Sequence, residues 1–382
     1  MKLLYITQMY PSKELPQYCV FLHLQVKALT ANGTEVTVVI PTTEKGSGTT
    51  TYDGVPVIYL SYQDYSRSAL YGLVSRQLSR ELSQFCSADE YDAVYAIHAP
   101  ANILDFAKNL AQKHRKPLIV HYRGYNIFEE FNKEPKAFLS DPEKVREKVV
   151  KASALSIGVS QKTVDIITER FPDAPVAVIY NGVDTSLFAS LDQAPQSSDI
   201  HILCVANLIP IKGHKYLFDA VKTLSEKHPE LTLITDIVGR GFYEPELKKY
   251  VEEKQIPNVV FHGYVPHDEV AQFMKNTDIF VLASVYESFG NVTVEAMACK
   301  KPVVIFEGQG ADEIIEDGVS GMIAEKGNNA ELTDRIERLV LDRQLRATIG
   351  ENGSKTVKKL TWDASAKNII RASENVLKQY EA

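Results

Sequence analysis

A short apolar run, Ile279-Phe280-Val281-Leu282-Ala283, leads into the stretch Glu287-Ser288-Phe289-Gly290-Asn291-Val292-Thr293-Val294-Glu295. The run predicts a buried strand, and the apolar pattern that begins near Gly290 predicts a helix. Glu287 then lies in a strand-to-helix loop, at the edge of a parallel sheet where open α/β folds bind ligands, while Glu295 lies one to two turns inside the helix. The stretch therefore predicts an α/β fold with a ligand site at this edge.

The residues between the two glutamates are suited to binding an anion. Backbone N–H groups at a helix start lack intrahelical acceptors, and the helix dipole favours negative charge there. After Ser288, the residues that would present such groups are Phe289, Gly290, Asn291 and Val292. Two hydroxyl-accepting carboxylates on either side of a phosphate cradle suit a nucleotide-sugar. A solvated turn glutamate followed by an ordinary helical glutamate is the alternative.

Length and composition limit the class of protein. A chain of 382 residues is long enough for two domains. Its net charge of −7 argues against a nucleic-acid partner, because neutralising phosphates requires a basic face. The four cysteines are scattered without zinc spacing, which is typical of a reducing compartment. The first apolar segment is too short for a signal peptide and no run is long enough to span a membrane, so we expect a cytoplasmic protein.

Short β-branched runs alternate with amphipathic stretches along the whole chain, the pattern of doubly wound parallel sheets. Strands are predicted at 3–7, 36–40, 55–60, 93–97, 118–122, 155–159 and 176–180, and then at 202–206, 231–238, 259–262, 279–283, 303–306 and 321–324. The polar segment 189–198 is a plausible linker. We expect two Rossmann-like domains, 1–188 and 199–362, facing a central cleft. A last helix from about 364 to 382 is expected to pack back on the first domain.

Loops of the second half carry further candidates. Lys212 stands just before a predicted helix, where its ammonium can reach a phosphate; a plain surface lysine is the alternative. Gly239 and Arg240 follow a strand, but Glu244 replaces the third glycine of a dinucleotide fingerprint, so a tight turn explains them as well. The loop with Tyr264 and Val265 ends another strand, and its backbone is placed to meet a base edge.

The first half offers two candidates on the opposite wall of the expected cleft. His98 follows the strand 93–97 and Arg123 follows the strand 118–122. A bonded structural histidine is the more common explanation of a lone His. The helical segment 68–85 carries an apolar stripe with arginines beside it, which suits either a peripheral membrane contact or, more simply, packing on the protein's own sheet.

Together these segments resemble family 4 of the retaining glycosyltransferases, whose members have the two-domain glycosyltransferase-B (GT-B) fold. The resemblance covers nearly the whole chain, and its strongest part is the Glu-x7-Glu motif within 284–299. Further similar segments are Asn181-Gly182-Val183-Asp184-Thr185, Val238-Gly239-Arg240-Gly241, Phe261-His262-Gly263-Tyr264-Val265 and Asp317-Gly318-Val319-Ser320-Gly321. The opening of the chain is similar to members that build bacterial surface polysaccharides.

The resemblance implies roles for three side chains. Glu295 would bond the ribose hydroxyls, Glu287 would contact the donor sugar, and Lys212 would bind the diphosphate. The family usually has an arginine where this chain has Asn207, so Arg240 is a candidate substitute. Arg123 stands where the family usually has a histidine.

We therefore expect a hexose to be transferred, with retention, from a nucleoside-diphosphate sugar to a glycan or lipid-linked acceptor. A UDP-sugar is favoured only by its frequency in the family. No Asp-x-Asp occurs, so no dependence on a divalent metal is expected. The nucleotide-sugar is the donor substrate, and no cofactor is expected. His98 or Arg123 is expected to assist catalysis. A nucleotide-sugar epimerase of the same fold and a non-catalytic sugar-nucleotide sensor are the alternatives.

Overall fold

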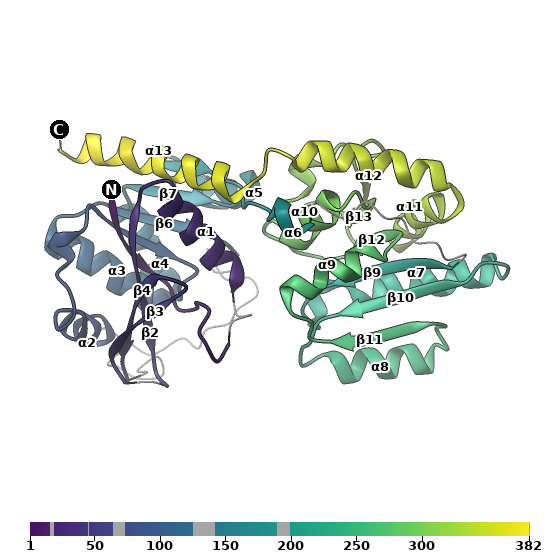
Figure 1. Ribbon diagram of the computed structural model, residues 1–382, viewed down its shortest axis with the longest axis horizontal. Coiled ribbons are helices and arrows are strands. Elements are labelled where there is room, and N and C mark those ends of the chain that lie inside the picture. Colours follow the sequence, from purple (N-terminus) through teal and green to yellow (C-terminus); the bar gives the residue numbers. More distant parts are fainter. Residues whose placement is uncertain (16–18, 45, 64–72, 125–141, 189–198, 382) are drawn as a thin grey trace. The chain divides into compact units, whose positions relative to one another are not determined.

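The computed structural model describes residues 1–15, 19–44, 46–63, 73–124, 142–188 and 199–381, and it divides into two compact units (Figure 1). The first unit comprises Met1–Tyr180 and Trp362–Ala382, and the second comprises Asn181–Thr361. Segment 181–188, which the sequence assigned to the first domain, thus belongs to the second unit, where Val183 bridges to Thr361. The predicted linker 189–198 lies outside the described residues.

Among the described residues of the first unit, the strands form one sheet in the order β3-β4-β2-β1-β5-β6-β7-β8. The strands are β1 (Lys2–Ile6), β2 (Glu35–Thr42), β3 (Gly48–Tyr52), β4 (Val55–Ser61), β5 (Ala93–Ile97), β6 (Leu118–Tyr122), β7 (Leu155–Gly158) and β8 (Val176–Val178). Neighbours are parallel except for the β3–β4 hairpin. Strand β3 was not predicted from the sequence, because its threonines are exposed and lack the apolar alternation of a half-buried strand.

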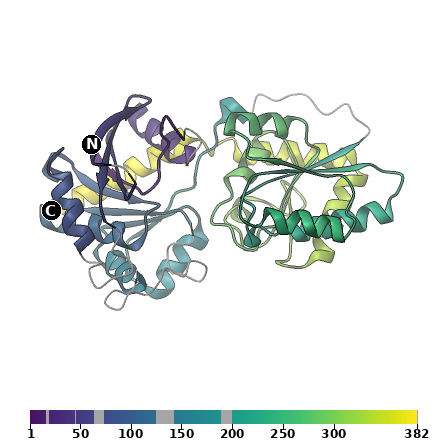
Figure 2. The same ribbon diagram turned by 90° about the horizontal axis from the view of Figure 1, so that it is seen from below.

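Alternating side chains of the first sheet enter two cores, one on each face. Leu3 and Tyr5 pack with α1 (Val20–Ala31) and α13 (Trp362–Glu381). Leu4 and Ile6 pack against the helices of the opposite face. These helices are α2 (Leu73–Leu82), α3 (Ala101–His114), α4 (Pro142–Ala152) and α5 (Gln161–Arg170). Both views show α13, the last helix of the chain, running along the first unit beside α1 (Figures 1 and 2).

The position of helix α2 shows that its apolar stripe packs on the protein's own sheet. Val74, Leu78 and Leu82 are buried in the core against the sheet, which is the simpler of the two alternatives. These side chains are therefore not a free surface for a membrane. The start of the stripe, 68–72, lies outside the described residues. No described helix is both long and apolar enough to cross a bilayer.

The second unit has a parallel sheet in the order β11-β10-β9-β12-β13-β14 over the residues described. Its strands are β9 (Ile200–Val205), β10 (Leu233–Val238), β11 (Val259–Gly263), β12 (Ile279–Leu282), β13 (Val303–Phe306) and β14 (Met322–Ala324). Its helices are α6 (Thr185–Phe188), α7 (His214–Lys227), α8 (Glu244–Glu253), α9 (His267–Lys275), α10 (Asn291–Ala298), α11 (Asn329–Leu341) and α12 (Arg343–Val357). The predicted class, α/β with two doubly wound domains, is confirmed.

The strand order reverses once in each sheet, and each reversal is a switch point at which an open α/β sheet has a crevice. In the second unit the chain runs outward from β9 through β10 to β11, and on the other side from β12 through β13 to β14. Ligands of open α/β sheets bind beyond the carboxyl ends of the strands at such a switch point. The loops after β9 and β12 flank it in the second unit. The equivalent loops of the first unit follow β1 and β5.

Candidate functional site

Glycines allow the loops at the carboxyl edge of the second sheet to pack directly on one another. A Cβ atom on three of them would lie far inside contact distance of a backbone oxygen, namely Gly213 against Ala283 (1.8 Å), Gly239 against Ala206 (1.9 Å) and Gly310 against Ser288 (1.9 Å). The loops after β9, β10, β12 and β13 therefore form one continuous surface. Backbone atoms can approach this closely only where no side chain intervenes.

An ion pair spans the switch point of this surface. Lys212 ends a short 3-10 turn after β9, and Gly213, in the left-handed region at φ 68°, starts α7 immediately after it. Glu287 lies in the loop after β12, and its carboxylate accepts a hydrogen bond from the Lys212 ammonium. The two side chains are 12% and 17% exposed, so the pair is mostly shielded from solvent but still reachable. The tertiary structure brings these two candidates together from 75 positions apart.

The amino-terminal end of α10 opens beside this pair. Gly290 occupies the N-cap position at φ 80°, and no side chain of the described residues caps the helix. Thr293 donates its N–H to the Gly290 carbonyl, while the N–H groups of Asn291 and Val292 have no earlier helical acceptor. Asn181 donates its side-chain amide to the Asn291 side chain (2.8 Å), which fixes the first residue of the helix. Two of the four N–H groups that the sequence predicts for an anion cradle, those of Asn291 and Val292, thus lie at the start of α10, and the binding of an anion there stays a prediction.

Glu295 lies further along α10 and is buried. One carboxylate oxygen accepts a hydrogen bond from Nε2 of His267 (2.9 Å). The other oxygen is buried and has no hydrogen-bond partner among the described residues. A buried carboxylate oxygen without a partner costs about 1–3 kcal/mol, so it is a good acceptor for a ligand hydroxyl.

The remaining second-half candidates gather around the ends of β9, β10 and β11. The Arg240 guanidinium lies over the Tyr264 ring at 5.1 Å, and Val265 follows in the same loop. The loop after β9 joins them, because Leu208 donates its N–H to the Arg240 carbonyl (2.9 Å). Asn207, beside Leu208, is exposed. These positions share one end of the sheet.

The first-half candidates meet around one aromatic ring. The Arg123 guanidinium lies over Phe21 at 5.2 Å and over Trp362 at 5.6 Å. None of its three nitrogens has a hydrogen-bond partner among the described residues. His98 packs edge-on against Phe21 at 6.1 Å and holds a left-handed backbone, φ 47°. Burial, helped by the positive charge of Arg123, lowers the pKa of His98 to about 4, so its imidazole is neutral near pH 7.

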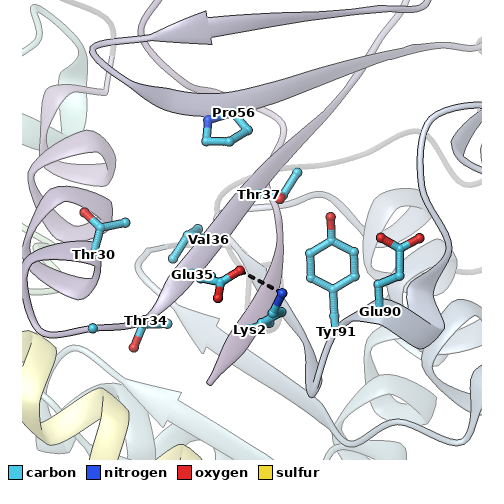
Figure 3. A pocket seen from close by; sticks show the side chains of 10 residues that line it. Lys2, Thr30, Thr34, Glu35, Val36, Thr37, Pro56, Glu90 and Tyr91 are labelled. Atoms are coloured by element: carbon cyan, nitrogen blue, oxygen red, sulfur yellow. Dashed lines mark ion pairs between the residues drawn. The ribbon is translucent and has the colours of Figure 1, made fainter.

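A separate hollow of about 520 Å³ lies at the opposite edge of the first sheet (Figure 3). It is lined by Lys2 and Glu35, which begin β1 and β2, together with Thr30, Pro56 and Tyr91. Lys2 and Glu35 pair with each other at 2.9 Å, as Figure 3 shows. The hollow therefore lies at the amino ends of the strands, away from the loops that carry the candidate residues.

Three residues that help to build the site were not predicted to do so. His267 holds Glu295, and Asn181 holds Asn291. Gln309 is fully buried and donates to the carbonyls of Leu282 (3.1 Å) and Ser284 (3.0 Å), which ties β12 to the loop after β13. Asn181 lies in a segment that carried the family resemblance, but its partner is 110 positions away and not visible in the sequence. Over the described chain, no group of three or more His, Cys, Asp or Glu residues could hold a metal ion.

Comparison with known protein families gives a match in each half of the chain. Residues 191–356 match the model described as "Glycosyl transferases group 1". Residues 20–187 match the model described as "Glycosyltransferase Family 4". The two matches together span almost the whole chain, and their boundary falls next to the one between the two structural units.

Among curated relatives, an uncharacterised glycosyltransferase of Methanocaldococcus jannaschii is 32% identical over 52% of this chain and 53% of its own length. The capsular polysaccharide biosynthesis glycosyltransferase CapM of Staphylococcus aureus is 33% identical over 40% of each chain. The chain thus spans about half the length of these relatives, or less.

Two solved structures share the fold along the whole chain. Sucrose-phosphate synthase of Thermosynechococcus elongatus has a TM-score of 0.79 at 17% identity, covering 99% of this chain and 100% of that one. HepE of Anabaena, solved with UDP-glucose, has a TM-score of 0.72 at 22% identity, covering 98% and 100%. At these identities the likeness concerns the fold.

Proposed function

Because this chain belongs to the family 4 glycosyltransferases of the GT-B fold, we propose that it transfers a hexose from a nucleoside-diphosphate sugar to a glycan or lipid-linked acceptor. A UDP-sugar is the favoured donor, and a protein of this fold has been solved with UDP-glucose. The observation that carries the proposal is the Lys212–Glu287 pair across the switch point, with the open start of α10 and the free oxygen of Glu295 beside it.

The proposed chemistry places each group where charge develops. The bond between the anomeric carbon and the diphosphate oxygen breaks, and its electron pair leaves with the diphosphate. Lys212 and the N–H groups of Asn291 and Val292 stabilise that negative charge, and fixed donors of this kind are usually the largest catalytic contribution. Glu287 accepts hydrogen bonds from sugar hydroxyls, and Glu295 accepts them from the ribose.

Retention of the anomeric configuration is part of the proposal. The acceptor hydroxyl oxygen bonds to the anomeric carbon on the face that the diphosphate leaves, and its proton passes to a phosphate oxygen. His98, neutral at pH 7, is proposed to orient this hydroxyl, and Arg123 is proposed to assist from beside it. NMR of the product decides the point, since an inverted anomeric centre rules out this course.

The test of the proposed function begins with binding. Thermal unfolding is measured with a panel of nucleoside diphosphates and their sugars, because a ligand at 100 times its Kd stabilises by about 2.7 kcal/mol. Release of nucleoside diphosphate is then followed with the best donor and a range of glycan and lipid-linked acceptors. The proposal fails if no panel member binds and no donor is consumed.

Further features of the proposal concern metal, location and pathway. We propose a metal-independent reaction, so activity that is lost with a chelator and restored by Mg²⁺ contradicts it.

The name of the Staphylococcus relative supports a role in surface polysaccharide synthesis. All four cysteines are free, which supports a reducing cytoplasmic location. A lipid-linked acceptor would place the protein at the inner face of the membrane, and co-sedimentation with anionic vesicles tests this peripheral contact.

Neither alternative function has a specific observation in the described residues behind it. An epimerase converts its nucleotide-sugar without an acceptor, so product analysis in the absence of acceptor separates it from a transferase. A sensor binds the donor but never consumes it. Donor consumption that is lost in Glu287→Ala therefore excludes the sensor.

A further inference from the structure

The carboxylate of Glu295 is held from one side only. Nε2 of His267, the first residue of α9, donates to one of its oxygens at 2.9 Å. The second oxygen is buried, and no residue in the described part of the chain bonds to it. A carboxylate has about four acceptor positions, so Glu295 retains capacity for two hydroxyls after bonding His267.

His267 is itself fixed by packing. Its imidazole lies against the Phe188 ring, with ring centres 5.3 Å apart. Phe188 is fully buried, and its carbonyl accepts a hydrogen bond from the thiol of Cys299, the residue that follows α10. The imidazole is thus clamped between α6 and α10. A side chain locked in this way can hold the group that it bonds in a single orientation.

The charges that face His267 are acidic. Burial alone lowers the pKa of His267, but the hydrogen bond and charge of Glu295, with the carboxylates of Asp184 and Asp268, outweigh it and raise the pKa above the ordinary value. Asp184 lies before α6 and accepts hydrogen bonds from Ser186 and Leu187. Asp268 follows His267 in α9. The imidazolium form therefore persists to higher pH than in an ordinary histidine, and it is lost as pH rises through the raised pKa.

We propose that His267 is the positioning residue of the ribose site: it orients Glu295 toward the two ribose hydroxyls and makes the affinity for the nucleotide depend on pH. This inference rests on the proposed function, in which Glu295 binds the ribose. Vicinal hydroxyls require a carboxylate held in one plane, and a charged donor holds it more firmly than a neutral one. Loss of the proton weakens this hold without removing the ribose-binding group.

The experiment measures the Kd of UDP by calorimetry between pH 5.5 and 8.5 for the wild type, His267→Gln and His267→Ala. If UDP does not bind, the tightest nucleoside diphosphate of the panel replaces it. Glutamine retains an N–H donor but cannot be charged. The phosphate of the ligand ionises in the same way in both measurements, so the ratio of the wild-type affinity to the His267→Gln affinity at each pH does not depend on it. We expect this ratio to be about fivefold at low pH, the ratio of a charged to a neutral hydrogen bond, and to approach one at high pH.

A second measurement compares UDP with 2′-deoxy-UDP. The wild type should discriminate by roughly tenfold, because removing one hydroxyl leaves one acceptor position of the buried Glu295 carboxylate unfilled. His267→Ala should reduce this discrimination, since Glu295 is then free to turn away. Substituting His228 with the same two residues is the matched control, because His228 also pairs with a glutamate, Glu337, but lies at the far end of α7. This control should leave both measurements unchanged.

The possible outcomes separate the two proposals. A wild type to His267→Gln ratio that stays constant with pH overturns the inference, as does a ribose preference that survives in His267→Ala. If His267→Ala does not fold, the glutamine series still decides. A wild type that binds no nucleoside diphosphate at any pH overturns the proposed function, and the inference with it.

Discussion

Replacing Lys212 with alanine should slow the reaction far more than the loss of one hydrogen bond would suggest. The substitution removes the ammonium aimed at the leaving diphosphate, and losing one such donor costs about 10²–10³ in rate. It also leaves Glu287, only 17% exposed, without its cation beside an incoming anion. Two like charges about 5 Å apart at an effective dielectric of about 20 repel by about 3 kcal/mol, so diphosphate binding should weaken as well.

This second effect makes a sharper prediction than the rate alone. In a Lys212→Ala background, the further change Glu287→Gln removes the uncompensated charge and should restore part of the lost affinity, by about tenfold or more. In the wild-type background, Glu287→Gln should also tighten binding of the nucleoside diphosphate, because it removes the same carboxylate charge and leaves the Lys212 ammonium without a competing partner. Calorimetry with the diphosphate alone isolates this effect from sugar contacts.

The assays are the calorimetric Kd and the rate of diphosphate release at saturating donor. Lys215→Ala is the matched control, because Lys215 lies three residues further on, in the first turn of α7, but pairs with the exposed Glu246 at 2.7 Å. Its effect should stay below about fivefold, since an exposed pair is worth about 0–1 kcal/mol. An unchanged rate in Lys212→Ala removes Lys212 from the mechanism. A double variant that binds no better than Lys212→Ala refutes the charge-repulsion reasoning.

Three more predictions concern stability. In a urea titration, Gly310→Ala should destabilise the second unit by about 1–3 kcal/mol, because its Cβ would lie 1.9 Å from a backbone oxygen; it should also weaken diphosphate binding. Gly48→Ala, with open space around it, should leave the unfolding free energy nearly unchanged in the same titration. The pKa of His98 is lowered to about 4, so the unfolding free energy of the wild type should fall as pH drops from about 6.5 through 4. Asparagine tolerates the left-handed backbone of this position and does not titrate, so in His98→Asn the fall should be smaller by about 3 kcal/mol. Arg123→Met should raise the unfolding free energy by about 1 kcal/mol and lower turnover. Desolvating an unpaired charge costs several kcal/mol, whereas each cation–ring contact returns only about 0.5–2 kcal/mol. A destabilised variant contradicts this.

Much of the fold was accessible from the sequence because parallel strands buried on both faces leave continuous apolar runs. Such runs marked β1, β5, β6, β9, β12 and β13 close to their observed bounds. The exposed threonines of β3 leave no such pattern, and that strand was missed. The domain boundary was displaced for a similar reason: α6 has only four residues, too few to show a helical period, so nothing in 181–188 indicated which unit it would join.

The sequence by itself determined which residues follow the carboxyl ends of strands, and hence that Lys212, Glu287 and Glu295 lie at one edge of a parallel sheet. This information is local, since a strand, a loop and a helix start follow one another in the chain. Which of these loops become neighbours was decided by the tertiary structure. The placement of β12 beside β9 brings Glu287 to Lys212, and the packing of α9 near α10 gives Glu295 its histidine. Side-chain periodicity records which face of an element is buried but not which element covers it, so these pairings exist only once the sheet has assembled.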